Sequence, residues 1–155
     1  MEENILKKDI TECHYDVAKN CLFSKTRTVS RYITNLYTQA LKEVGVTPVQ
    51  YSMLTAIQIL KEGNINDLSS ALKMDRTTIN RNLKPLIREG FVFINESSDK
   101  RERRIIITKE GETIYQKGYI NWQQAQCDFQ NILREEKRDE MSNLLDEIIK
   151  TIAPK

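Results

Sequence analysis

Apolar residues recur along much of the chain at alternating spacings of four and three positions, which is typical of one face of a helix. One stripe predicts a helix over 20–44 and consists of Leu22, Thr26, Val29, Ile33, Leu36 and Ala40. Another predicts a helix over 109–133 and consists of Ile114, Gly118, Trp122, Ala125, Phe129 and Ile132. Such heptad-like stripes are suited to packing along another helix. Residues 1–15 show only a weak helical pattern.

Capping residues, glycines and a proline divide the segment between these helices into shorter elements. Gly45 ends the first helix, and Thr47 with Pro48 begins a second over 48–61, because Thr caps helices and Pro fits the first helical position. Asn64 and Asp75 are N-cap candidates for a third and a fourth helix. The positions predicted to face inward are Tyr51, Met53, Leu54, Ile57, Leu60, Ile65, Leu68, Ala71, Leu72, Ile79, Leu83, Leu86 and Ile87.

Two β-rich runs, 91–94 and 104–107, are joined by a polar loop and predict a hairpin. Thr108 caps the helix that follows. A last helix over 135–152 carries one apolar face, formed by Met141, Leu144, Leu145, Ile148, Ile149 and Ile152. The predicted fold is therefore mainly α with a small β-hairpin: a helix–turn–helix and hairpin between helical arms. Three apolar stripes exceed what so small a central module needs, which favours a helical dimer interface.

Composition limits the class of protein. A chain of 155 residues, 39% hydrophobic and 30% charged, is expected to form one soluble globular domain. No stretch approaches the roughly 20 apolar residues of a membrane span, and the acidic, weakly apolar start does not resemble a signal peptide. A cytoplasmic protein without a membrane partner is expected.

The candidate nucleophiles and metal ligands are few. Cys13, Cys21 and Cys127 are an odd number at wide spacing and do not form a disulfide framework, and His14 is the sole histidine. Adjacent residues on a helix diverge by about 100°, so Cys13 and His14 cannot act as a nucleophile and base. There is no phosphate-binding glycine motif. We predict no enzyme activity, no metal site and no cofactor.

Positive charge is concentrated over 73–104. This segment holds nine Lys and Arg and five Asp and Glu, a net of +4, whereas the whole chain has a net charge of +2. Arg, Asn and Thr are suited respectively to guanine edges, adenine edges, and phosphate or the thymine methyl, and helix N-terminal amides favour phosphate. The predicted DNA-binding residues are Arg76, Thr77, Thr78, Asn80, Arg81, Lys84, Arg88, Lys100, Arg101 and Arg103.

Within the hairpin loop, an Arg at the tip can enter a narrow minor groove. Asp99 precedes Arg101 by two residues and is placed to hold its guanidinium. The alternative is a winged-helix module that docks a protein. That alternative requires an apolar exposed face on the fourth helix, instead of the polar face formed by Thr77, Arg81, Lys84 and Arg88.

The motifs of this region resemble those of the MarR (multiple antibiotic resistance regulator) family of winged helix–turn–helix repressors. Asp99-x-Arg101 followed by Ile107-Thr108-x-x-Gly111 resembles the family's wing signature, with Ile107 in place of Leu. Residues 68–78 and 83–92 resemble its helix–turn–helix, and 45–51 resemble the start of its second helix. The resemblance covers about 20–150.

This resemblance implies a single domain over 1–155, with a winged helix–turn–helix lobe over 48–111 and dimerisation helices over 20–44 and 112–152. It implies a homodimer bound to a pseudo-palindromic operator with half-sites about 34 Å apart. The fourth helix would enter the major groove. Asp99 would support the wing, and Arg101 would probe the minor groove. Most members repress transcription until a ligand or an oxidant loosens DNA binding.

The resemblance leaves two kinds of signal open. A small aromatic ligand, bound in the cleft between the dimer helices and the DNA-binding lobe, is favoured. The alternative is a thiol sensor acting through Cys21. Aligning 30–31 and Tyr37 with the hydroperoxide-sensing branch places its cysteine at Phe23, two residues from Cys21, and one of the partner tyrosines is replaced by Pro48.

Overall fold

The structure, a computed structural model, describes residues 10–95 and 103–152. The chain divides into two compact units, Met1–Asn35 and Leu36–Lys155. The described residues are mainly helical with a two-stranded antiparallel sheet, which confirms the predicted fold class. No helix in 10–95 or 103–152 combines the length and apolar character needed to cross a membrane.

The first unit contains a helix that the pattern did not predict. Helix α2 (Ile10–Asn20) precedes α3 (Leu22–Leu41), and Cys21 separates them. Its exposed apolar residues include Tyr15 and Val17. It was not predicted because residues 1–15 show only a weak helical pattern in the sequence.

The helix predicted over 20–44 is shorter in the structure. Helix α3 ends at Leu41 and continues as a 3₁₀ turn, η1 (Lys42–Val44). Gly45 has φ +75° and its amide donates to the Lys42 carbonyl oxygen. The prediction that this helical segment ends at Gly45 is therefore confirmed, and its last turn is a tighter 3₁₀ turn.

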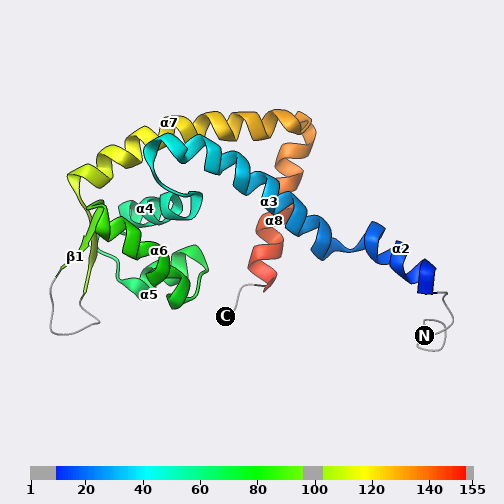
Figure 1. The fold of residues 1–155 in the computed structure, drawn as a ribbon, viewed down its shortest axis with the longest axis horizontal. Coiled ribbons are helices and arrows are strands. Elements are labelled where there is room, and N and C mark those ends of the chain that lie inside the picture. The colour runs from blue at the N-terminus through cyan, green and yellow to red at the C-terminus, as the bar shows by residue number, and fades with distance from the viewer. Residues whose placement is uncertain (1–9, 96–102, 153–155) are drawn as a thin grey trace. The chain divides into compact units, whose positions relative to one another are not determined.

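The second unit begins with three helices that pack around one core: α4 (Pro48–Leu60), α5 (Ile65–Leu72) and α6 (Arg76–Arg88). Their N-caps are confirmed. Thr47 and Asn64 each form a capping box, with Gln50 and Asp67 respectively. These three helices and the hairpin lie together beside one end of α7 (Lys109–Ile132) (Figure 1).

Most of the predicted inward positions are buried. The fully buried members include Met53, Leu54, Ile57, Leu68, Ile79, Leu83 and Leu86. Two predictions are wrong: Ala71 is exposed and Ile87 is 38% exposed. Each lies one position, and therefore about 100°, from the centre of its helix's buried stripe. The core stripe of α6 is thus narrower than the pattern indicated.

The hairpin consists of β1 (Val92–Ile94) and β2 (Ile105–Ile107), each one residue shorter than predicted. The strands are antiparallel, with Val92 opposite Ile107. The Ile105 amide also donates to the Gly63 carbonyl oxygen at 2.9 Å. This bond attaches β2 to the loop between α4 and α5. The predicted residues Asp99, Lys100 and Arg101 lie outside the described part of the chain.

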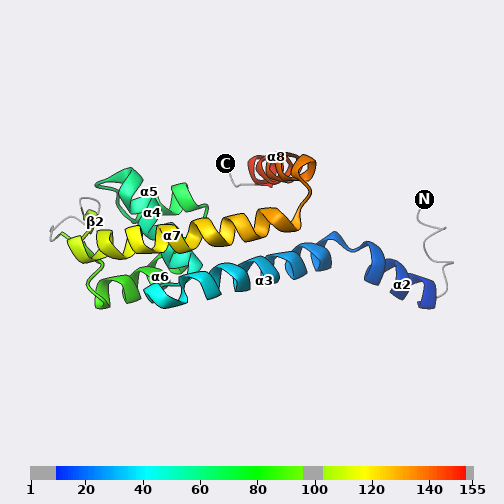
Figure 2. The ribbon, with the colours of Figure 1, turned by 90° about the horizontal axis from the view of Figure 1, so that it is seen from above.

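Two glycines allow α7 to approach the lobe closely. A Cβ on Gly111 would lie 2.0 Å from the Phe91 carbonyl oxygen, and a Cβ on Gly118 would lie 2.6 Å from the Tyr51 ring. After α7 the chain turns into α8 (Glu135–Ile152), whose bounds match the prediction (Figure 2). The Arg138 guanidinium ties the start of α8 to α7 by donating to the Gln130 carbonyl oxygen at 2.9 Å.

Gly111→Ala is expected to destabilise the protein. Alanine is the better helix former by about 1 kcal/mol, but here its methyl would collide with backbone and the overpacking should cost about 1–3 kcal/mol or more. The midpoint of urea unfolding should fall. Gln116→Ala, at an exposed position of the same helix, serves as the control and should leave it within error. A Gly111→Ala variant as stable as the unmodified protein would contradict the close approach.

Candidate nucleic-acid interface and aromatic pocket

The exposed face of α6 is positively charged. Arg76, Arg81, Lys84 and Arg88 are exposed, and no acidic residue occurs within the helix. On the opposite face the apolar stripe is buried in the core. The structure therefore presents the predicted basic side chains to solvent. Arg88 is partly neutralised, since its guanidinium lies 3.0 Å from the Glu89 carboxylate at the end of the helix.

The N-terminus of α6 is held by Asp75. One Asp75 carboxylate oxygen accepts from the Thr78 amide, and the other accepts from the Thr78 hydroxyl, each at 2.8 Å. The amide bond first, and then the hydroxyl bond, hold the pKa of Asp75 below its ordinary value of 3.8. Thr78 is half-buried. Its observed contacts stabilise the helix start, a role that the sequence prediction missed although Asp-x-x-Thr spacing indicates it.

The other α6 side chains predicted to contact DNA differ in whether they already form a hydrogen bond within the protein. The Asn80 side-chain amide donates to the Arg76 carbonyl oxygen at 2.8 Å. The side chains of Thr77, Arg81 and Lys84 are exposed and form no hydrogen bond or ion pair within 10–95 and 103–152. These three side chains are available to a partner without breaking an internal bond.

The turn between α5 and α6 is fixed by Ser69 and Lys73. The Ser69 hydroxyl donates to the Met74 carbonyl oxygen, and the Met74 amide donates to the Ser69 carbonyl oxygen at 3.1 Å. Lys73 has φ +53°, in the left-handed region that a side chain rarely adopts. The paired bonds across the turn hold α6 in a defined direction relative to α5.

The base of the hairpin loop is closed by Asn95. Its side-chain oxygen accepts from the Arg104 amide at 2.5 Å, and its own amide donates to the Arg104 carbonyl oxygen at 3.0 Å. The sequence analysis did not single out Asn95, although a polar residue at the end of a strand is a turn signal. Asn95 determines where the basic loop leaves the sheet.

A hollow of about 580 Å³ brings three predicted residues together. Arg76 and Asn80 of α6 line it with Arg103 of the hairpin, beside Asn64 and Ile65 at the start of α5. Residues separated along the chain thus form one cationic surface that spans the helix and the hairpin.

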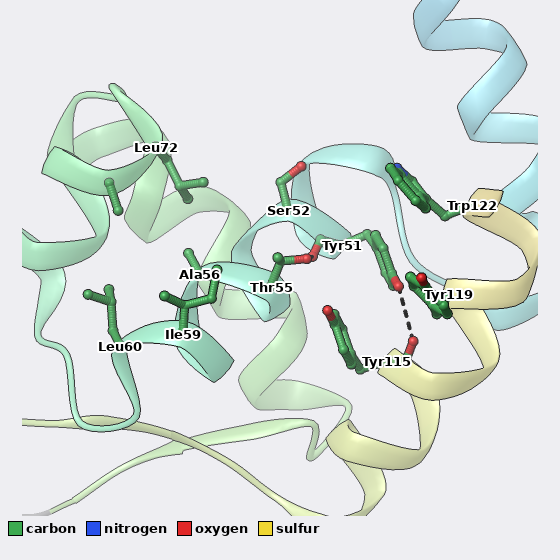
Figure 3. Close-up of a pocket in the computed structure, with 11 residues that line it drawn as sticks. Tyr51, Ser52, Thr55, Ala56, Ile59, Leu60, Leu72, Tyr115, Tyr119 and Trp122 are labelled. Carbon is green, nitrogen blue, oxygen red and sulfur yellow. Dashed lines mark hydrogen bonds between the residues drawn. The ribbon is translucent and has the colours of Figure 1, made fainter. Parts of the chain in front are cut away.

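A second cavity, of about 420 Å³, lies between α4, α5 and α7 (Figure 3). Aromatic side chains dominate one wall, and the residues concerned are Tyr51, Tyr115, Tyr119 and Trp122. The remaining lining residues are Ser52, Thr55 and five alanine, isoleucine or leucine residues. No pocket residue was predicted, and Trp122 was interpreted as a packing residue. The i, i+4, i+7 spacing of the α7 aromatics places them on one face of the helix, but it does not indicate the cavity that they line.

Tyr51 forms the inner wall of this aromatic pocket. Its ring is stacked on Tyr115 with centroids 5.3 Å apart, and its hydroxyl donates to the Tyr115 carbonyl oxygen at 3.1 Å (Figure 3). Burial, with a smaller contribution from the neighbouring tyrosines, raises the pKa of Tyr51 to about 12. Tyr119 and Trp122 form a second stacked pair, with centroids 5.9 Å apart.

Cys21 lies between α2 and α3 and is half-buried. Hydrogen bonding with the Ser24 side chain, and then with its backbone, lowers the pKa of the Cys21 thiol and so favours its thiolate. Within the described part of the chain, no group of three or more His, Cys, Asp or Glu residues is placed to hold a metal ion.

No protein-family model matches the chain. It is 24% identical over 115 residues to YwoH of Bacillus subtilis, an uncharacterised HTH-type transcriptional regulator, covering 74% of this chain and 84% of YwoH. It is 34% identical over 86 residues to the HTH-type transcriptional regulator SarZ of Staphylococcus epidermidis. That alignment covers 55% of this chain and 58% of SarZ, which is less than two thirds of its length.

Solved structures extend the likeness to most of the chain. The transcriptional regulator MosR of M. tuberculosis, solved in complex with DNA, is 27% identical with a TM-score of 0.71, covering 86% of this chain and 99% of that one. A mutant of MarR from E. coli, solved with operator DNA, has a TM-score of 0.78 at 19% identity, covering 92% and 99%. The second likeness, at its lower identity, shows a shared fold.

The Asp75 cap predicts a pH dependence. Since folding lowers the pKa of this carboxyl group, its contribution to stability is present above the unfolded pKa, near 4, and is lost as pH falls through the lower folded value. Asp75→Ala should therefore lower the urea midpoint at pH 7, and the difference should shrink between pH 4 and pH 3. Asp146→Ala, in the middle of α8, is the control. A difference that stays constant over this range would contradict the charged cap.

Proposed function

We propose that the chain is a winged helix–turn–helix transcriptional regulator of the MarR type and that it binds duplex DNA as a homodimer through α6 and the hairpin. The observation that carries this proposal is the solvent-facing side of α6, which holds four cations and no acid. Phosphate neutralisation by such side chains supplies much of the affinity for DNA.

The side chains of α6 divide by position. Thr77 and Arg81 lie toward its N-terminus, are exposed, and are proposed to contact base edges in the major groove. Lys84 and Arg88 lie farther along and are proposed to hold phosphates. Arg101, which lies outside the described residues, is proposed to probe the minor groove, with Asp99 behind it.

A second copy of the chain is the proposed partner of the C-terminal helix. Its apolar face is largely exposed in the single chain, at Leu144, Leu145, Ile148, Ile149 and Ile152. An apolar face of this extent is characteristic of an interface between proteins. We propose that 20–44 and 112–152 form the dimerisation helices around a DNA-binding lobe over 48–111, and that half-sites lie about 34 Å apart on a pseudo-palindromic operator.

A small molecule in the aromatic pocket is the proposed signal that releases DNA, which would make the protein a repressor. The pocket lies where α4 of the lobe packs against α7, so its contents bear on both elements. Its volume of about 420 Å³ is within the range of small-molecule sites. A thiol switch at Cys21 is the second candidate, favoured by the lowered pKa of that thiol. It requires loss of DNA binding on peroxide treatment.

Two α6 variants separate base reading from phosphate binding. Arg81→Ala should relax preference at one position of sites selected from a random DNA pool, by about 1–3 kcal/mol. Lys84→Ala should weaken binding to all sequences alike and reduce the slope of log affinity against log salt by about one. Glu110→Ala, an exposed residue outside α6, is the control. If the unmodified protein binds no duplex DNA at low salt, the proposed function fails.

Ile148→Glu should disrupt the homodimer, because it places a charge within the apolar face of α8. The mass measured by sedimentation equilibrium should shift toward that of the 18.1 kDa monomer. Circular dichroism would verify that the helices persist, and Asn143→Glu, at an exposed polar position of α8, should remain dimeric. A dimer that survives Ile148→Glu with unchanged affinity would exclude this face from the interface.

A further inference from the structure

We infer that the aromatic pocket selects an uncharged planar aromatic molecule that carries an N–H or O–H donor, and that it disfavours aromatic carboxylates. This inference rests on the proposed release of DNA by a small molecule and specifies its chemical class. It follows from the charges, hydrogen bonds and helix ends around the pocket.

The lining offers no counter-charge to an ionised ligand. Its eleven residues include no Asp, Glu, Lys, Arg or His. Helix α4, which supplies six of them, contains no charged residue along its whole length. An unpaired carboxylate would lose its hydration here without gaining an ion pair, and burying a charge in that way is strongly unfavourable. An uncharged ligand avoids this cost.

The hydroxyl groups on the α4 wall are already engaged as donors. Ser52 donates to the Pro48 carbonyl oxygen and Thr55 donates to the Tyr51 carbonyl oxygen, each at 3.0 Å. Tyr51 donates to the carbonyl oxygen of Tyr115. What these groups retain is acceptor capacity on their oxygens. A carboxylate only accepts and so gains no hydrogen bond from the α4 wall, whereas an amide or a phenol can donate to the oxygens of that wall without breaking an existing bond.

The C-terminal turns of two helices contribute residues to the pocket lining. Ile59 and Leu60 belong to the last turn of α4, and Ala71 and Leu72 belong to the last turn of α5. The carbonyl groups at a helix C-terminus carry partial negative charge. The positive N-terminus of α4 is in contrast satisfied by its own capping box at Thr47. The helix dipoles, taken by themselves, therefore favour an uncharged ligand over an anion.

The arrangement of the rings favours a flat ligand. The stacked pairs Tyr51–Tyr115 and Tyr119–Trp122 have interplanar angles of 13° and 16°. Aliphatic side chains of α4 and α5 lie across the cavity from these rings (Figure 3). A planar ring inserted between these surfaces can make offset stacking contacts on one side and apolar contacts on the other.

The test compares three ligands of one shape and different charge: 2-naphthamide, 2-naphthoate and 2-naphthylmethylammonium. Binding to the full chain without DNA is measured by isothermal titration calorimetry at pH 7. The amide is expected to bind at least ten-fold more tightly than the carboxylate. The inference is overturned if the carboxylate binds as tightly as the amide, if the ammonium binds most tightly, or if none of the three binds.

A variant that adds a positive charge tests whether the selectivity arises in this pocket. Ile59 is 75% exposed at the rim, so Ile59→Arg should be tolerated by the fold and should narrow or reverse the preference for the amide. Ser70→Arg adds the same charge at an exposed position outside the lining and should preserve the ten-fold ratio. Equal effects of the two variants would contradict a site in this pocket.

The same three ligands also show whether ligand binding changes the affinity for operator DNA. If 2-naphthamide binds selectively but leaves the affinity for operator DNA unchanged, the proposed release of DNA fails and the ligand class stands. If DNA is released by the carboxylate and the amide at equal concentrations, regulation stands and the ligand class fails.

Discussion

The packing of Tyr51 against Gly118 is the contact on which the arrangement of the second unit depends. A Cβ at Gly118 would lie 2.6 Å from the Tyr51 ring, so only glycine lets α4 approach α7 this closely. At that distance the Tyr51 hydroxyl reaches the Tyr115 carbonyl oxygen and the two tyrosine rings stack. The same contact joins the lobe to the long helix and forms the inner wall of the aromatic pocket. Gly111 likewise allows a close approach of α7 to the lobe, in this case to the Phe91 carbonyl oxygen.

The two surfaces proposed for function share this framework. Helix α4 lines the pocket with Ile59 and Leu60 and leads directly into the loop at Gly63. The Gly63 carbonyl oxygen accepts from Ile105 of the hairpin, which connects the end of α4 to β2 through one hydrogen bond. A ligand that displaces the last turn of α4 would therefore act on the element that carries the basic loop. This gives the proposed regulation a short structural route.

The exposed basic residues and the exposed apolar residues lie on different helices. Helix α6 presents arginines, a lysine and a threonine to solvent, while α8 presents a row of leucines and isoleucines. A polyanion and a second copy of the chain are the partners that suit these respective surfaces. One copy would supply one reading helix, and the apolar face of α8 would bring the second copy to a two-fold-symmetric site.

Local chemistry in the sequence determined where most elements begin and end. Thr47, Asn64, Asp75 and Thr108 were predicted as N-caps, and each forms its side-chain bond to the helix, because capping depends on residues three positions apart. The basic face of α6 was likewise predicted from helical periodicity. Only the tertiary structure showed that Ala71 and Ile87 are exposed and that an aromatic pocket exists. That pocket could not be predicted because its walls, Tyr51 on α4 and Tyr115 on α7, are 64 residues apart and meet through the close approach at Gly118.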